Sequence, residues 1–115
     1  MANWTDTKIN IIVGDEDKTE NIEKVISIFK SEEVYKTLPD FGEVFTSDYS
    51  SDYGEIFCSF RWSLQESVEG LAKICKDNAV AMRIISEEEA MGFTEVVCIS
   101  EEGEVVQNQG IDWAL

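Results

Sequence analysis

The sequence has 115 residues, a length typical of one domain with one hydrophobic core. It contains 24 Asp and Glu against 9 Lys and Arg, with no histidine, so its formal net charge is -15. A field of this sign repels nucleic acid and anionic membranes and attracts basic protein surfaces. We therefore expect one acidic domain, residues 1–115, that does not bind nucleic acid or membranes directly.

The start of the chain and its cysteines favour a cytoplasmic protein. No basic region followed by an apolar run opens the sequence, and no apolar stretch is long enough to span a bilayer. Cys58, Cys75 and Cys98 are odd in number and form no C-x-x-C pair. This spacing disfavours a disulfide framework or a zinc site and indicates a reducing compartment.

In the first half of the chain, alternating and helical patterns predict a strand and a helix. Apolar residues alternate over residues 7–13, which predicts a strand that ends before Gly14. An amphipathic stripe over residues 22–29 predicts a helix that begins in a capping box of Asp17 and Glu20. Pro39 bounds this helical region. A poorly patterned segment follows, with a possible short strand at 44–45 and loop composition over 47–54.

The second half predicts a strand, a helix and three further strands. Bulky residues alternate over 56–62, and Ser63 and Glu66 frame a capping box before an apolar helical face that extends to Cys75. Strands are expected at 79–86, 93–99 and 104–106, the last two joined by a hairpin with Gly103 at a positive φ. The tail to residue 115 has no clear pattern.

This order of elements predicts an α+β fold. We expect a ferredoxin-like split β-α-β sandwich, an antiparallel sheet with two helices on one face, extended by an extra C-terminal β-hairpin.

Several short motifs resemble one known family. These are Asn3-Trp4 before the first strand, Gly14 after it, Phe60-Arg61-Trp62-Ser63 before the second helix, and an acidic turn leading into Gly92-Phe93. Together they are similar to the YubB-type ferredoxin-like family of small plasmid- and phage-borne proteins, whose molecular function is undefined. The resemblance implies the ferredoxin-like fold and a mobile-element origin.

The residue inventory predicts neither catalysis nor a cofactor. Without histidine the chain lacks the commonest general base and every Ser-His or Cys-His pair. Residues 15–19 faintly resemble a calcium loop, but Glu20 and Ile26 occupy the positions that need glycine and glutamate. No glycine-rich phosphate loop is present. We expect a protein that is not an enzyme and that uses no cofactor or metal.

The uneven distribution of charge gives the main functional hypothesis. No Lys or Arg occurs in residues 84–115 or 37–60, whereas both segments are rich in acids. We predict that these acids, with two tyrosines in a loop-like segment, bind a basic protein partner. Burial of the tyrosines against the sheet is the alternative for them. The predicted partner-binding residues are Glu87, Glu88, Glu89, Glu95, Glu101, Glu102, Glu104, Asp48, Asp52, Tyr49 and Tyr53.

Three functions remain open at this point. The first is a small inhibitor from a mobile element whose carboxylates imitate nucleic-acid phosphates and occupy the basic groove of a host defence or nucleic-acid enzyme. The second is a structural module whose exposed sheet edge pairs with a second copy, so the chain is expected to be a monomer or homodimer. The third is a metal-dependent carboxylate enzyme. A solvated acidic surface that serves only solubility explains the same residues.

Overall fold

The computed structural model describes residues 4–113. Its central strand is β1 (Asp6–Ile12), which pairs antiparallel with β3 (Tyr53–Phe60) on one side and with β4 (Ala81–Glu88) on the other. The alternation that predicted the first strand places Ile9 and Ile11 on one face, where both are fully buried. This part of the sequence analysis is confirmed.

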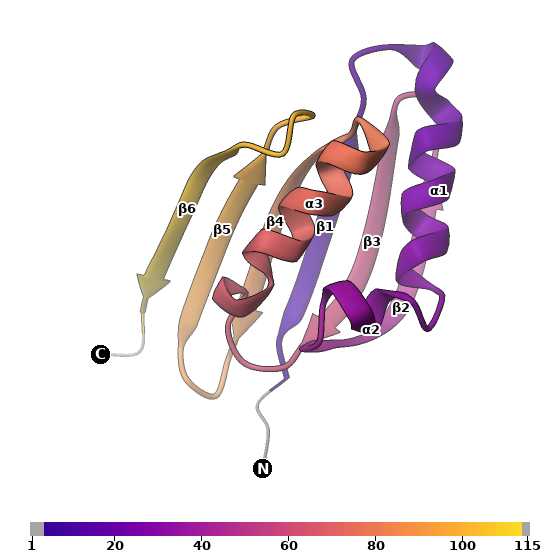
Figure 1. Cartoon of the computed structure of the whole chain (residues 1–115). Helices are drawn as coiled ribbons and strands as arrows, with labels where there is room; N and C mark the ends of the chain where they lie inside the picture. The colour runs from indigo at the N-terminus through magenta and orange to yellow at the C-terminus, as the bar shows by residue number, and fades with distance from the viewer. Residues whose placement is uncertain (1–3, 114–115) are drawn as a thin grey trace.

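Three more strands complete the sheet. β2 (Phe41–Tyr49) pairs with β3, while β5 (Phe93–Ile99) pairs with β4 and β6 (Val105–Asp112) pairs with β5. The result is one antiparallel sheet in the order β2-β3-β1-β4-β5-β6. The chain is therefore an α+β protein, and its C-terminal hairpin extends the sheet on the β4 side (Figure 1).

The strands extend further than the sequence predicts. Residues 47–54 were expected in a loop, which is wrong for 47–49 in β2 and for 53–54 in β3, because strand pairing outweighs their loop-like composition. The tail after Val106, for which no element was predicted, continues as a strand to Asp112, because it pairs in register with β5.

Three helices cover one face of this sheet. α1 (Thr19–Phe29), the short α2 (Val34–Thr37) and α3 (Val68–Asn78) all lie on the same side, as Figure 1 shows. Short 3-10 helices at Glu16–Lys18 and Gln65–Ser67 precede α1 and α3. None of the helices in the described part of the chain is long and apolar enough to cross a membrane.

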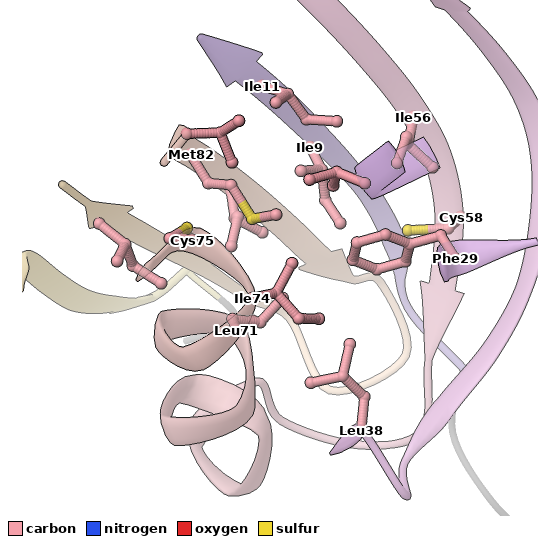
Figure 2. Close-up of a cluster of buried hydrophobic side chains, with 14 of the residues drawn as sticks. Ile9, Ile11, Phe29, Leu38, Ile56, Cys58, Leu71, Ile74, Cys75 and Met82 are labelled. Carbon is pink, nitrogen blue, oxygen red and sulfur yellow. The ribbon is translucent and has the colours of Figure 1, made fainter. Parts of the chain in front are cut away.

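The core lies between these helices and the sheet. Figure 2 shows side chains from β1, β3 and β4 meeting those of α1 and α3, including Ile9, Phe29, Ile56, Leu71 and Met82, all of which are buried. Burying a large apolar side chain stabilises a fold by about 1.5–3 kcal/mol.

Neither predicted capping box forms. α1 begins after Lys18, which has no capping side chain, and Asp15 instead caps the preceding 3-10 helix by accepting from the Asp17 amide. α3 begins at Val68, later than predicted, and Ser67 before it provides no side-chain cap. In both places a 3-10 turn separates the acidic segment from the helix, so the side chains are out of register with the helix start.

The strands of the sheet end at a lower and an upper end. The lower end in Figure 1 contains Asp6, Phe60, Glu88 and Phe93; the upper end contains Ile12, Tyr53, Ala81 and Ile99. The β4–β5 turn lies at the lower end. The β2–β3 and β5–β6 turns lie at the upper end.

Candidate protein-binding surface

The face of the sheet opposite the helices presents large apolar side chains. Residues that alternate with the core point to this face, and among them Phe45, Phe57 and Ile85 are exposed by 54%, 42% and 36%. They come from β2, β3 and β4, so three strands contribute to one surface. We call this side of the sheet the open face.

These three side chains surround a shallow hollow of about 350 Å³. The charged residues of its lining are Asp6, Lys8 and Glu87. A second hollow, of about 740 Å³, shares Asp6 and Phe45 and continues to Trp4 and Glu43. The open face therefore combines aromatic contact area with several carboxylates near the lower end of the sheet.

Two carboxylates face each other beside the first hollow. The β1–β4 register places Asp6 opposite Glu87, and both side chains are exposed. Like charges directly opposite on neighbouring strands destabilise a sheet. Neither carboxylate forms an ion pair with any residue that the structure describes. Their charge is therefore available to a cation from outside the chain.

Lys8 shows how a cation is held on the same face. Its ammonium lies 3.7 Å from a carboxylate oxygen of Glu55 and 5.7 Å from the centre of the Phe57 ring. This cation–π and ionic arrangement compensates Glu55, which lies opposite Asp48 in the β2–β3 register. Because Lys8 is engaged there, the Asp6–Glu87 pair is the carboxylate pair of this face without an internal counter-ion among the described residues.

All three tryptophans lie at the lower end of the sheet. Trp4 pairs with Arg61 just before β1, Trp62 follows β3, and Trp113 follows β6. Their exposed fractions are 53%, 44% and 51%. Trp62 also has a φ of 65°, an unusual conformation for a bulky side chain. Tryptophan is enriched at the energetically dominant positions of protein interfaces.

The structure divides the predicted acidic residues between the two ends. Glu87 and Glu89 are exposed at the lower end, near the hollow. Asp48, Asp52, Glu102 and Glu104 are exposed at the upper end. The predicted set therefore does not form one continuous row, and the lower group is the one beside the aromatic surface.

Three other predicted acids, Glu95, Glu88 and Glu101, form hydrogen bonds or ion pairs within the fold. Glu95 is 5% exposed and accepts hydrogen bonds from the Leu64 amide at 2.8 Å, from Ser63 Oγ and from the Gln65 side-chain amide. Glu88, 4% exposed, accepts from the Ala90 and Met91 amides and closes the β4–β5 turn. We leave both out of the candidate surface because their oxygens bind the chain itself.

Glu101 is likewise occupied at the upper end. One carboxylate oxygen accepts from the Gly14 amide at 3.2 Å, and the other lies 3.5 Å from Lys18 Nζ. This residue ties the β5–β6 turn to the loop after β1, and it is also left out of the candidate surface.

The two predicted tyrosines make internal hydrogen bonds at the upper end. Tyr49 donates to a carboxylate oxygen of Glu23, and this bond together with the negative charge of Glu23 raises the pKa of the Tyr49 hydroxyl. Tyr53 is half-buried, and its hydroxyl lies 2.7 Å from the side-chain amide of Asn10, which donates to it in the orientation that also lets Asn10 accept from Arg83. Tyr49 stays exposed, whereas Tyr53 fits the burial alternative better.

The cysteines provide no reactive nucleophile in the core. Burial raises the pKa of the Cys58 and Cys75 thiols to about 12, so both stay protonated at neutral pH. Cys98 is half-buried in β5, with Sγ 3.5 Å from Oε1 of Gln107. Within the described residues, no three Asp, Glu, Cys or His side chains cluster closely enough to hold a metal ion.

Sequence reasoning missed the residues that form the hollow. Phe45, Phe57 and Ile85 fall in predicted strands and Asp6 lies just before the first one, but none was given a functional role, because their grouping depends on the strand order and on register. The available signal was Phe57, whose position in the alternation of residues 56–62 places a large aromatic on the face away from the core.

Comparisons with family models, with curated proteins and with solved structures give no match to this chain. The similarity to the YubB-type family therefore stays a prediction from the sequence motifs.

Proposed function

We propose that this chain is a non-enzymatic binding protein that docks a basic protein on the open face of its sheet. The observation that carries the proposal is the pair Asp6 and Glu87, which lie opposite each other beside an apolar hollow and have no counter-ion among the residues that the structure describes. A Lys or Arg side chain of a partner would lay its aliphatic stem on Phe45, Phe57 and Ile85 and place its cation between the two carboxylates.

The energetics favour an external cation at this position. Neutralising the Asp6–Glu87 pair removes a like-charge repulsion between neighbouring strands and adds charge-assisted hydrogen bonds. The surrounding net charge of -15 raises the rate of encounter with a basic surface at low salt. The exposed Trp4 next to the hollow adds aromatic area that interfaces use for affinity.

The partner that this surface suits best is a nucleic-acid-binding protein. We propose that the lower-end carboxylates Asp6, Glu43, Glu87 and Glu89 occupy its basic groove in the place of phosphates, which makes the chain an inhibitor of a host enzyme or defence complex. The absence of Lys and Arg from residues 84–115 supports this reading, since no cation of that segment repels the groove. A mobile-element origin follows from the family resemblance alone.

The finer fold assignment and the compartment belong to the same proposal. The order β2-β3-β1-β4, with α1 between β1 and β2 and α3 between β3 and β4, supports a ferredoxin-like split β-α-β unit. Three free cysteines support a reducing cytoplasm.

The test compares two charge reversals of equal size. The tagged chain captures its partner from source cells at low salt, and the purified partner is then titrated with the wild type, with D6K/E87K and with D52K/E102K. Each double variant changes one Asp and one Glu to Lys, but the second pair lies exposed at the upper end. We expect D6K/E87K to weaken binding about tenfold or more and D52K/E102K to weaken it less than about threefold.

The outcomes separate a defined site from a diffuse charge effect. Equal losses in both variants would mean that only the net charge matters, and unchanged binding of D6K/E87K would remove the open face from the interface. Circular dichroism of both variants checks that the domain still folds.

A further inference from the structure

The two edges of the sheet differ in their protection against pairing with another strand. The β2 edge contains two register irregularities between Phe41 and Thr46, and it carries Glu43 and Asp48. Bulges and charges are what natural proteins use to block edge-to-edge pairing. The β6 edge has one register irregularity, between residues 105 and 107, but residues 105–111 are uncharged and every residue of β6 is exposed.

The backbone of β6 presents free hydrogen-bonding groups at alternate residues. The Trp113 amide donates to the Gly92 carbonyl at 2.8 Å, so residue 113 faces β5. Register is regular from Gln107 to Asp112. Because the backbone groups of an antiparallel strand alternate in direction, residues 109 and 111 also face β5, whereas Asn108 and Gly110 face outward.

The sequence of β6 is chemically symmetric about Asn108. In an antiparallel pair of two copies centred there, Asn108 lies opposite itself and Gln107 opposite Gln109. Beyond these pairs, which lie in the regular part of β6, the count along the sequence places Val106 opposite Gly110 and Val105 opposite Ile111, across the irregularity between residues 105 and 107. Matching polar pairs at the centre and apolar pairs outside them are the cross-strand contacts that stabilise a sheet.

Gly110 offers a position on β6 where a substitution can separate strand pairing from packing within the chain. A Cβ on Gly110 would meet nothing within 4 Å, and its φ is not positive, so nothing in the described part of the chain requires glycine there. Because side chains project out of the plane of a sheet, a methyl group at this position leaves the backbone edge of β6 open to a second strand.

We propose that two copies of this chain form a symmetric dimer by antiparallel pairing of β6 with β6, which joins their sheets into one of twelve strands. The strand chemistry identifies the occupant as a second copy rather than another protein, since the same segment supplies both halves of each matched pair. This interface lies on the edge beyond β5, apart from the open-face hollow between β2 and β4.

Charge limits the strength of this dimer. Pairing brings Glu104 opposite Asp112 of the second copy at both ends, and each copy has a net charge of -15. Screening by salt weakens both repulsions. Self-association should therefore be stronger at high salt.

The first test uses proline at an outward-facing position with alanine as the matched control. Sedimentation is measured from about 10 to about 500 µM in about 0.5 M NaCl, a range that covers weak interfaces. We expect the wild type and G110A to approach twice the 13.0 kDa monomer mass. G110P loses the outward N–H of both copies but no hydrogen bond to β5, and should dimerise about tenfold more weakly or not at all.

Amide hydrogen exchange of the wild type tests β6–β6 pairing even if G110P does not fold. At high protein concentration the Asn108 and Gly110 amides should gain protection, while the Gln109 and Ile111 amides are protected at every concentration. A wild type that stays monomeric throughout the range would overturn the proposal. A dimer that leaves Asn108 and Gly110 unprotected would overturn it as well.

Discussion

At the scale of single residues, the three cysteines have the same chemistry and different surroundings. Cys58 and Cys75 are packed in the core, where burial raises the pKa of each thiol to about 12. Cys98 is half-buried on the open face of β5, next to the edge strand. The thiolate is the reactive form, so protonation and burial protect the first two thiols together.

This difference predicts the pattern of thiol labelling. In the folded protein at about pH 8, an aromatic disulfide reagent should label Cys98 and leave Cys58 and Cys75 to react only at the rate of unfolding. Raising the pH to about 9.5 should not expose the two core thiols, because it stays well below their raised pKa. Mass spectrometry of the labelled peptides checks the assignment, and labelling in denaturant should reach all three. Fast labelling of Cys75 in the native state would contradict this packing.

Two acids are buried, and the alternation of side chains along their strands reveals this. Glu95 shares its face of β5 with Val97 and Ile99, and Glu88 shares its face of β4 with Met82 and Ile84. An acid that lies on the same face of a strand as buried apolar residues is therefore a candidate structural residue rather than a surface charge. Charge alone does not distinguish Glu88 and Glu95 from the exposed acids, whereas the alternation of each strand does.

At the scale of elements, α3 closely approaches the C-terminal end of α2 and the residue after it at Gly70. A Cβ on this residue would collide with the Thr37 carbonyl oxygen and would lie 2.8 Å from Leu38 Cδ2. Leu38 is fully buried, so its side chain has little room to move. The glycine therefore permits the packing of the helix against this segment.

We predict that G70A is less stable than G110A. Overpacking at Gly70 should lower the free energy of unfolding by about 1–3 kcal/mol. The higher helix propensity of alanine offsets up to about 1 kcal/mol of this loss. G110A, with open space around the new methyl group, should be unchanged or slightly more stable. Urea denaturation at low protein concentration measures both. Equal stability of the two variants would show that α3 shifts freely on the sheet.

The sequence predicts those elements whose burial pattern is local. Hydrophobic periodicity predicts β1, α1 and β3, because one face of each element is packed against the core and the other is not. Periodicity fails for residues 47–49 and for β6 after Val106, since strand pairing holds these polar segments rather than burial. The candidate surface is less predictable still: Asp6 and Glu87 are 81 positions apart, and only strand order and register bring them together.

At the scale of the whole molecule, acidity acts differently on the two proposed interfaces. The open face uses its carboxylates to attract a cationic partner, whereas the β6 edge is uncharged over residues 105–111 and must overcome repulsion between two chains of charge -15. The Debye length falls from about 10 Å at 0.1 M salt to about 3 Å at 1 M. Salt should therefore change the two equilibria in opposite directions.

This prediction is checked with one protein in one salt series. From about 0.05 to about 0.5 M NaCl, the affinity for the basic partner should fall and the fraction of β6-paired dimer should rise. D6K/E87K tests the assignment, because it should flatten the salt dependence of partner binding, while G110P should remove the salt-promoted dimer and leave partner binding unchanged. If both equilibria weaken with salt in the wild type, then ion pairs between the two copies hold the dimer together, and the neutral β6 edge is not its interface.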